Sequence, residues 1–585
     1  MDNYFVSSCK RVKDWICRQF GQKEKKTVHH KKFANGGEVI VWETGRAGEE
    51  AASYENLFLR KEIAGFRTNI RREQSCSIKS LTRDYLYKQL LSSGEYTFDH
   101  MLVIKDPYGE APLTALALFI LEEPARVRVT TKGNLEVTDF VTELPKKKEH
   151  RVPILGMYAE KANDIVIEIL DDEGNCVKSH TFTIRTKRLP KSLRNVITVK
   201  KWTDKPAYSN IMINGGVKIH TCVFDIEGKI RYYLSRKPRG YGIFPLSDGH
   251  FFYMEKYISV PSYSNPQTVE SYDMDYFGRV FRTYLTEKGV HHTAEEKAGG
   301  NILTGSNSML EHTEDCVIEI DRQTGEIVWQ LNMAELFDET YQNMMDWCHV
   351  NSAAYYEKDR TILISLRNVH AVICVDYDTK KLRWILSDPK FWEGTKMTPY
   401  LLQPEGDVKW CYQQHAAFEI ALPDESNPQK KRIIVYDNHW AKRRKAKSFD
   451  NDPLSYVSFY DIDEEKKTVS LHKRFAGPKT RIRANGIYVP DKKRVYNMAG
   501  SYAEPVDGDG GGIFEYDYET GEVLSEFGVK PGFFRAYPFE PNVQELAEPM
   551  QVTGDYQVGQ IKQPQEISSS KYCKLKAEKK HHIKS

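Results

Sequence analysis

The chain has 585 residues, enough for two or more domains, and a formal net charge of +3 at pH 7. Residues 1–33 and 571–585 together carry a charge of +11, so the rest of the chain carries about −8. The basic residues are not interleaved with aromatic residues, which excludes a typical nucleic-acid-binding surface and favours solvated tails.

The cysteines and the apolar runs indicate the cellular compartment. The ten cysteines are scattered and form no C-x-x-C pair, which is typical of reduced thiols in a cytosolic protein. The first residues lack the apolar core of a signal peptide, and no apolar run is long enough to span a bilayer. We therefore expect a cytoplasmic protein without a membrane span.

The first 188 residues divide into two patterns. Residues 1–92 are predicted to form a basic tail and a helical extension, because apolar residues between Gly48 and Ser92 recur at three- and four-residue steps. Residues 93–188 contain about five short alternating segments separated by Gly and Asp turns, which predicts an immunoglobulin-like β-sandwich. At the other end of the chain, residues 546–585 are predicted to form a flexible, Lys-rich tail.

Residues 195–545 repeat one hairpin pattern six times. Each copy has alternating apolar residues, an Asp, a short polar turn and a second alternating run. The aspartates recur about every 58 residues, at Asp225, Asp273, Asp321, Asp376, Asp461 and Asp517. A hairpin that recurs at this period is typical of β-propeller blades, which bury their faces only against neighbouring blades. The sequence therefore predicts an all-β fold, with a six-bladed β-propeller after the β-sandwich.

Three segments within the repeats place a histidine at the start of an alternating run: His292 in VHHTAEE, His349 in DWCHVNS and His415 in QQHAAF. A propeller arranges equivalent positions of successive blades around one axis, so we expect these histidines to converge near the mouth of the channel. Asn351 shares a strand face with His349 because side chains alternate along a strand. Arg367 ends the returning strand of the same blade and can reach the same centre.

These residues allow more than one chemistry. Three imidazoles can bind zinc or another divalent ion, which would indicate a metal-dependent hydrolase. The nearby Arg367 repels a dication, however, and its guanidinium suits an oxyanion, which His and Asn donors would help to bind. A neutral imidazole in such a site can act as a nucleophile. A third alternative is a non-catalytic propeller that binds an anionic ligand or a protein partner.

The motif DWCHVNS, followed by SLRNVHAVICVDYDTKKLRWIL, QHAAF and YDN, resembles the PAPS-independent arylsulfate sulfotransferase (aryl sulfotransferase) family. The resemblance covers roughly residues 197–537, and the earlier segment YGEAPLTALALF resembles the N-terminal domain of that family. It implies that a sulfuryl group moves from a phenolic sulfate ester to a phenol acceptor, in a ping-pong reaction through a sulfohistidine. It also implies that the reaction needs no PAPS, no other cofactor and no metal.

The resemblance implies a role for each site residue. His415 matches the nucleophile of the family, and the sulfate-binding residues match His292, His349, Asn351 and Arg367. One of the two remaining histidines, with His292 the first choice and His349 the second, would protonate the departing phenolate. Members of the family suggest a homodimer, with the sandwich domain as an interface.

The chain departs from the family pattern at two positions. Thr293 stands where relatives commonly have an Asp after two histidines, so the acidic neighbour that could orient the first histidine is missing. Cys348 stands where an aromatic residue is frequent. The aromatic residues considered for a phenol pocket are Trp410, Phe418 and Tyr502.

Overall fold

A computed structural model gives the fold. It describes residues 28–33, 36–51, 76–216, 219–236, 241–258, 267–308, 312–338, 341–342, 345–422, 427–440, 449, 451–551 and 554–557. The basic tail before residue 28, residues 52–75 of the predicted helical extension and the tail after residue 557 lie outside the described residues. Within the described part of the chain, no helix is both long and apolar enough to cross a membrane.

The N-terminal domain is one seven-stranded sheet that folds into two layers. Its strands are β1 (Val28–Lys32), β2 (Glu38–Trp42), β3 (His100–Lys105), β4 (Ala115–Thr131), β5 (Phe140–Ile154), β6 (Ala162–Leu170) and β7 (Cys176–Arg185). The first part of β4 pairs with β3 and its last part pairs with β6, and between them the pairing with β5 changes register. The two halves bury one core, which includes Val103, Ala117, Val129 and Ile167.

This packing is that of the predicted β-sandwich, with one addition. Strands β1 and β2 come from the segment that we predicted as tail and helical extension, and β2 pairs with β3 in parallel. The helical prediction holds for α4 (Cys76–Ser92). The buried side chains of α4, among them Leu86 and Tyr87, share a cluster with Met274 and Val280 of the following domain, so α4 joins the two domains.

All six predicted hairpins are present. They are β10 (Cys222–Asp225) with β11 (Ile230–Tyr233), β14 (Gln267–Asp275) with β15 (Val280–Glu296), β17 (Cys316–Ile320) with β18 (Ile327–Asn332), β21 (Ala371–Asp376) with β22 (Leu382–Leu386), β26 (Leu454–Asp463) with β27 (Thr468–Pro478), and β30 (Gly511–Asp517) with β31 (Val523–Val529). In four of the turns the predicted Asp accepts hydrogen bonds from the N–H groups that follow it, whereas in the other two this Asp stands two residues later than predicted, at Asp275 and Asp463 rather than Asp273 and Asp461. In one of the four, the Asp321 carboxylate accepts hydrogen bonds from the N–H groups of Gln323 and Thr324, each at 2.8 Å.

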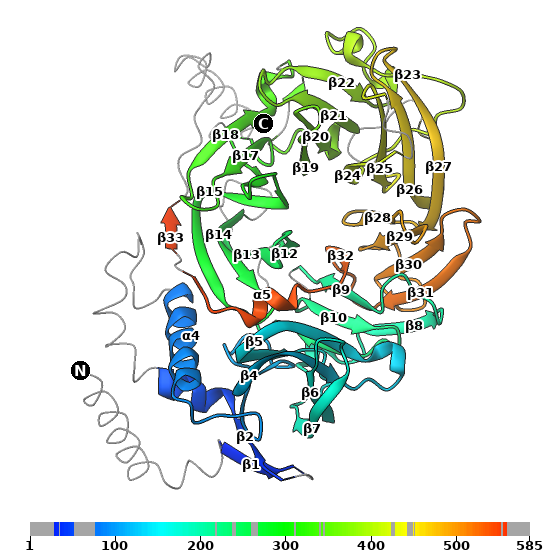
Figure 1. The fold of residues 1–585 in the computed structure, drawn as a ribbon. Coiled ribbons are helices and arrows are strands. Elements are labelled where there is room, and N and C mark those ends of the chain that lie inside the picture. The colour runs from blue at the N-terminus through cyan, green and yellow to red at the C-terminus, as the bar shows by residue number, and fades with distance from the viewer. Residues whose placement is uncertain are drawn as a thin grey trace.

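The sheets form a propeller-like ring (Figure 1), but the prediction of six separate blades is wrong. Four of the sheets have four or five strands and correspond to one blade each. They are β11-β10-β9-β32, β19-β20-β21-β22, β23-β27-β26-β25-β24 and β28-β29-β30-β31-β8. The strands not yet introduced are β8 (Ile197–Lys201), β9 (Asn210–Asn214), β19 (Val350–Tyr356), β20 (Thr361–Leu366), β23 (Gln403–Pro404), β24 (His415–Ile420), β25 (Lys430–Asp437), β28 (Asn485–Val489), β29 (Arg494–Ala499) and β32 (Arg535–Pro538).

The remaining repeats share one eight-stranded sheet, from β12 (Gly242–Pro245) and β13 (His250–Ile258) through β16 (Ile302–Ser306) to β18, with β33 (Gly554–Gln557) on β15. The long strand β15 explains the difference from the prediction. Its first residues pair with β14 and its last residues pair with β16, so hydrogen bonds continue across the border that we expected between two blades.

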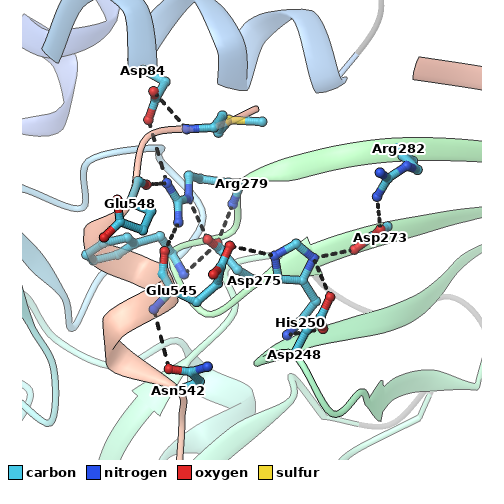
Figure 2. Close-up of polar contacts among 12 residues, drawn as sticks. Asp84, Asp248, His250, Asp273, Asp275, Arg279, Arg282, Asn542, Glu545 and Glu548 are labelled. Atoms are coloured by element: carbon cyan, nitrogen blue, oxygen red, sulfur yellow. Dashed lines mark hydrogen bonds and ion pairs between the residues drawn. The ribbon is translucent and has the colours of Figure 1, made fainter. Parts of the chain in front are cut away.

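After β32 the chain returns across the border between the two domains (Figure 2). The Arg279 guanidinium donates to the carbonyl oxygens of Glu545, in helix α5 (Val543–Ala547), and Glu548, at 3.1 and 2.6 Å. The Asp84 carboxylate of α4 accepts from the N–H of Met550 at 3.0 Å. The C-terminal segment therefore links the eight-stranded sheet to α4.

Candidate active site

The three predicted histidines lie at irregular positions of three neighbouring strand pairs. The pairing of β15 with β16 changes register at His292, that of β19 with β20 changes just after His349, and that of β24 with β25 changes just after His415. The φ angles of His292, His349 and Ala416 are positive, at +58°, +59° and +48°. Such bulges turn a side chain away from the direction that regular alternation would give it. We had expected His292 at the start of a strand, but it lies inside the long strand β15.

The structure brings the predicted residues together. The rings of His292 and His349 contact each other edge to face, with their centroids 4.7 Å apart. Arg367 follows β20 and donates to the side-chain oxygen of Gln413 at 3.2 Å, and Asn351 donates to the carbonyl oxygen of Gln414 at 2.7 Å. Arg367 and Asn351 therefore hold the residues directly before His415.

His415 has a defined tautomer. Its Nδ1 lies 2.5 Å from Oδ1 of Asn438, whose Nδ2 donates to the Thr480 hydroxyl at 2.8 Å. The Asn438 oxygen is therefore an acceptor, and the His415 proton is on Nδ1. Burial and the charge of Arg367 lower the pKa of His415 well below its ordinary value, against the Asn438 hydrogen bond, which raises it. At neutral pH, Nε2 carries a lone pair, which accepts from the Arg483 N–H at 3.3 Å.

His349 has the opposite charge state. Its Nδ1 lies 2.5 Å from a carboxylate oxygen of Glu314 and 3.0 Å from one of Asp346. Burial alone would lower the pKa of His349, but Asp346 and Glu314 outweigh it and raise the pKa to about 9. His349 is therefore an imidazolium at neutral pH, and its Nε2–H is available to another group.

His292 is neutral, and its hydrogen bonds place the proton on Nδ1. The neighbouring His291 donates from Nε2 to the carbonyl oxygen of Ser306 at 2.8 Å, so the Nδ1 of His291 is an acceptor. That atom lies 3.3 Å from Nδ1 of His292, which must be the donor. Burial, His349 and His291 lower the pKa of His292 well below its ordinary value. The Nε2 of His292 therefore carries a lone pair, which can accept a hydrogen bond but has no proton to donate.

The sequence interpretation missed four polar residues of this site: Glu314, Asp346, Asn438 and Arg535. Arg535 in β32 is 2% exposed and donates to the carbonyl oxygen of Asn351 at 2.8 Å. Its charge lowers the pKa of both His292 and His415. Asp346 stands three residues before His349 in the recognised motif, so its position was readable. Asn438 is the last residue of the YDN motif and was likewise readable. Glu314 and Arg535 lie in a loop and a strand that no local pattern connects to a histidine.

Aromatic side chains adjoin His292. The ring centroid of Tyr241 lies 4.4 Å from that of His292, and the ring of Phe534 lies 5.3 Å from Tyr241 and 6.0 Å from His292. The aromatic residues considered from the sequence pack in other clusters: Trp410 against one, and Phe418 and Tyr502 in another. They stabilise the sheets, and among the described residues no ring contact joins them to His292, His349 or His415, which is why Tyr241 and Phe534 replace them as candidates.

Two overlapping groups in the site have the composition of a metal site. They are His291, His292 and Glu314, and Glu314, Asp346 and His349. Two ligand atoms of one tetrahedral metal ion, each ~2.1 Å from the ion, lie about 3.4 Å from each other. In the second group, Nδ1 of His349 lies 3.0 Å from Asp346, with which it shares a hydrogen bond, and 2.5 Å from Glu314, which fits a shared proton better than a shared metal ion. In the first group, Nδ1 of His292 lies 3.3 Å from Nδ1 of His291 and 3.6 Å from Glu314, close to the spacing of metal ligands, so this group is where the metal alternative is tested.

Comparison with known proteins identifies the family. The family model described as Arylsulfotransferase (ASST) matches residues 195–535, more than half of the chain. The chain belongs to the arylsulfotransferase family. A second model, the arylsulfotransferase Ig-like domain, matches residues 102–187 and agrees with the two-layered N-terminal domain. The resemblance stated from the sequence is therefore confirmed.

Two curated arylsulfotransferases are similar to the chain over most of its length. Arylsulfate sulfotransferase AssT of Escherichia coli O6:H1 is 22% identical, and the match covers 73% of this chain and 90% of that protein. Arylsulfate sulfotransferase AssT of Lelliottia amnigena is 21% identical, with the same two coverages. All five predicted site residues lie inside the arylsulfotransferase match, and Arg535 is its last residue.

Proposed function

We propose that this arylsulfotransferase moves a sulfuryl group from a phenolic sulfate ester to a phenol, by a ping-pong reaction through a sulfohistidine at His415 and without PAPS. One observation supports this most: a neutral, buried His415 beside Arg367 shares a site with a positively charged His349. A nucleophile needs a lone pair, and a proton donor needs a proton, at the same pH.

In the first half-reaction, Nε2 of His415 attacks the sulfur of the donor. A nitrogen–sulfur bond forms, the bond from sulfur to the aryl oxygen breaks, and its electron pair stays on that oxygen. The Nε2 proton of His349 moves to the oxygen, so that a neutral phenol leaves. Arg367 and Arg535 would stabilise the negative charge on the sulfuryl oxygens, as cationic groups do in phosphoryl transfer.

The second half-reaction reverses these steps with the acceptor phenol. Its hydroxyl proton moves to Nε2 of His349, its oxygen bonds to sulfur, and the nitrogen–sulfur electron pair returns to His415. The protein ends in its starting protonation state. The donor already carries an activated sulfuryl group, so the cycle needs no nucleotide.

For the two candidate proton donors, we propose the order opposite to that expected from the sequence. We propose His349 rather than His292 as the acid, because Nε2 of His292 carries a lone pair whereas His349 is protonated. His292 suits a hydrogen bond from the hydroxyl of the incoming phenol. Tyr241 and Phe534, beside His292, offer ring faces for the aryl group of either substrate.

The experiment is the transfer assay with 4-nitrophenyl sulfate as donor and phenol as acceptor. Nitrophenolate should be released, and omission of phenol should leave a protein about 80 Da heavier, the mass of an SO₃ group on imidazole. Peptide mapping should locate this group on His415. Binding without any release of nitrophenolate would favour the non-catalytic alternative.

The metal-dependent alternative is tested in the same assay. Because the sulfohistidine scheme uses no metal ion, we expect EDTA to leave the rate of nitrophenolate release unchanged. Loss of activity with EDTA, followed by recovery with one added divalent ion, would favour a hydrolase and contradict the sulfohistidine scheme.

A further inference from the structure

Glu314 is a fully buried acidic residue without a role in the transfer scheme above. It lies between β16 and β17, and its backbone has a left-handed φ of +56°. Two hydrogen bonds hold it in this conformation: its N–H donates to Oδ1 of Asn307 at 2.7 Å, and its carbonyl oxygen accepts from the N–H of Val350 at 2.7 Å. A backbone held in this region outside glycine costs on the order of 1 kcal/mol or more, and such residues concentrate at functional sites.

The carboxylate of Glu314 contacts three groups from three different segments. Oε2 lies 2.5 Å from Nδ1 of His349. Oε1 accepts a hydrogen bond from the Tyr241 hydroxyl at 3.2 Å and lies 3.6 Å from Nδ1 of His292. The strained backbone thus aims one carboxylate at both histidines, which are the two candidates for proton transfer.

Asp346 completes the surroundings of the same nitrogen. Its two oxygens lie 3.0 and 3.1 Å from Nδ1 of His349, and its carbonyl oxygen accepts from the Asn368 side chain at 2.7 Å. Two buried carboxylates repel each other strongly unless a cation lies between them.

Among the described residues, the other imidazoles near His349 are those of His291, His292 and His415, and burial lowers the pKa of each. His349 is in contact with both carboxylates, so its own positive charge offsets theirs.

We propose that Glu314 and Asp346 are the positioning residues that fix the His349 ring and keep its Nε2–H aimed at the leaving oxygen. Glu314 would then supply, from another sheet segment, the acidic group that Thr293 does not supply next to His292. This inference rests on the proposed function. Its consequence is specific: a protonated leaving group departs as neutral phenol, so the rate depends little on how acidic that phenol is.

The test measures phenol release in a single turnover from a series of aryl sulfates, from 4-nitrophenyl, an acidic leaving phenol, to 4-methylphenyl, a weakly acidic one. With Glu314→Gln or Asp346→Asn, we expect release of 4-nitrophenol to fall less than tenfold. Release of 4-methylphenol should fall roughly 100-fold or more, the range that general acid catalysis contributes. Glu314→Asp should restore part of the loss.

A matched control separates positioning from simple support of the fold. Glu319 is also buried, on the adjoining strand β17, and contacts Lys297 at 3.4 Å. Glu319→Gln should lower the rates of all donors equally or not at all. An equal loss for all donors with Glu314→Gln and Asp346→Asn would overturn the inference, and if Glu314→Gln does not fold, Asp346→Asn alone decides. Failure of the proposed function would be visible separately, because the unmodified protein would release no phenol from any donor.

Discussion

Nδ1 of His349 lies 2.5 Å from Oε2 of Glu314, although one residue precedes β19 and the other precedes β17. This contact connects two sheets of the ring at the point where the proposed chemistry occurs. The contact also helps to raise the pKa of His349, whereas burial lowers the pKa values of His292 and His415.

The first prediction concerns pH. The pKa of His349 is raised to about 9, so the imidazolium form, and with it kcat/KM for 4-methylphenyl sulfate, should be lost as pH rises through about 9. Because this pKa lies above the unfolded value of ~6.5, the charged contact should stabilise the fold fully below pH 6.5 and no longer above 9. Glu314→Gln should move the alkaline loss of kcat/KM to lower pH. An unchanged alkaline limb in that variant would contradict the assignment.

The second prediction concerns Arg367. Arg367→Lys should reduce kcat/KM roughly 100- to 1,000-fold, because a point charge cannot reproduce a guanidinium fork on the sulfuryl oxygens. The control is Arg360→Lys, since Arg360 is half-exposed, pairs with Asp378 and lies at the opposite end of β20 from Arg367. Steady-state kinetics of both variants with 4-nitrophenyl sulfate would show the difference. If Arg367→Lys kept the kcat and KM of the unmodified protein, Arg367 would not be a sulfate ligand.

The third prediction separates the nucleophile from the acid. His415→Asn should abolish both the 80-Da adduct and the initial burst of phenol, because it removes the attacking nitrogen. His349→Asn should slow the adduct with 4-methylphenyl sulfate roughly 100-fold or more and still allow it. Intact mass spectrometry after quenching measures both. His439→Asn, at a buried histidine paired with Asp437, is the control and should form the adduct normally. An adduct that maps to His292 or His349 would exchange the proposed roles.

The fourth prediction concerns Asn438, which accepts the Nδ1 proton of His415. In Asn438→Asp, a carboxylate would replace the amide oxygen and raise the pKa of His415. The nucleophile would then be protonated at low pH, and the rate of adduct formation should rise as pH increases through the new pKa. Stopped-flow measurement of the phenol burst between pH 5 and 9 would show this. The same dependence on pH as in the unmodified protein would argue against nitrogen Nε2 of His415 as the nucleophile.

The fifth prediction concerns stability. Arg279 is fully buried, pairs with Asp275 at 2.5 Å and holds the C-terminal segment (Figure 2). Arg279→Met leaves an uncompensated buried carboxylate, so the free energy of unfolding should fall by about 3–5 kcal/mol. Arg360→Met, at an exposed ion pair, should change it by less than about 1 kcal/mol. Denaturant unfolding of the two variants provides the comparison, and equal effects would show that the segment is not held by Arg279.

The sequence was sufficient for features whose determinants lie close together in the chain. In the turn after Asp321, the carboxylate binds N–H groups two and three residues later. The residues that determine such a turn therefore lie within the hairpin itself. The motif around His349 and the segments around His292 and His415 were recognisable for the same reason. The alternation of apolar residues also predicted strands, because the period of two is local.

Only the tertiary structure decided how the strands join and which histidine is charged. Strand β15 pairs with both β14 and β16, and this merges two of the expected blades. The apolar periodicity of β15 predicts a strand but does not say with which strands it pairs. The charge of His349 depends on Asp346, three residues before it, and on Glu314, which reaches it from another sheet. The neutral state of His415 depends on its burial beside Arg367. Protonation follows from the dielectric and the charges around a group, and folding brings those together from distant parts of the chain.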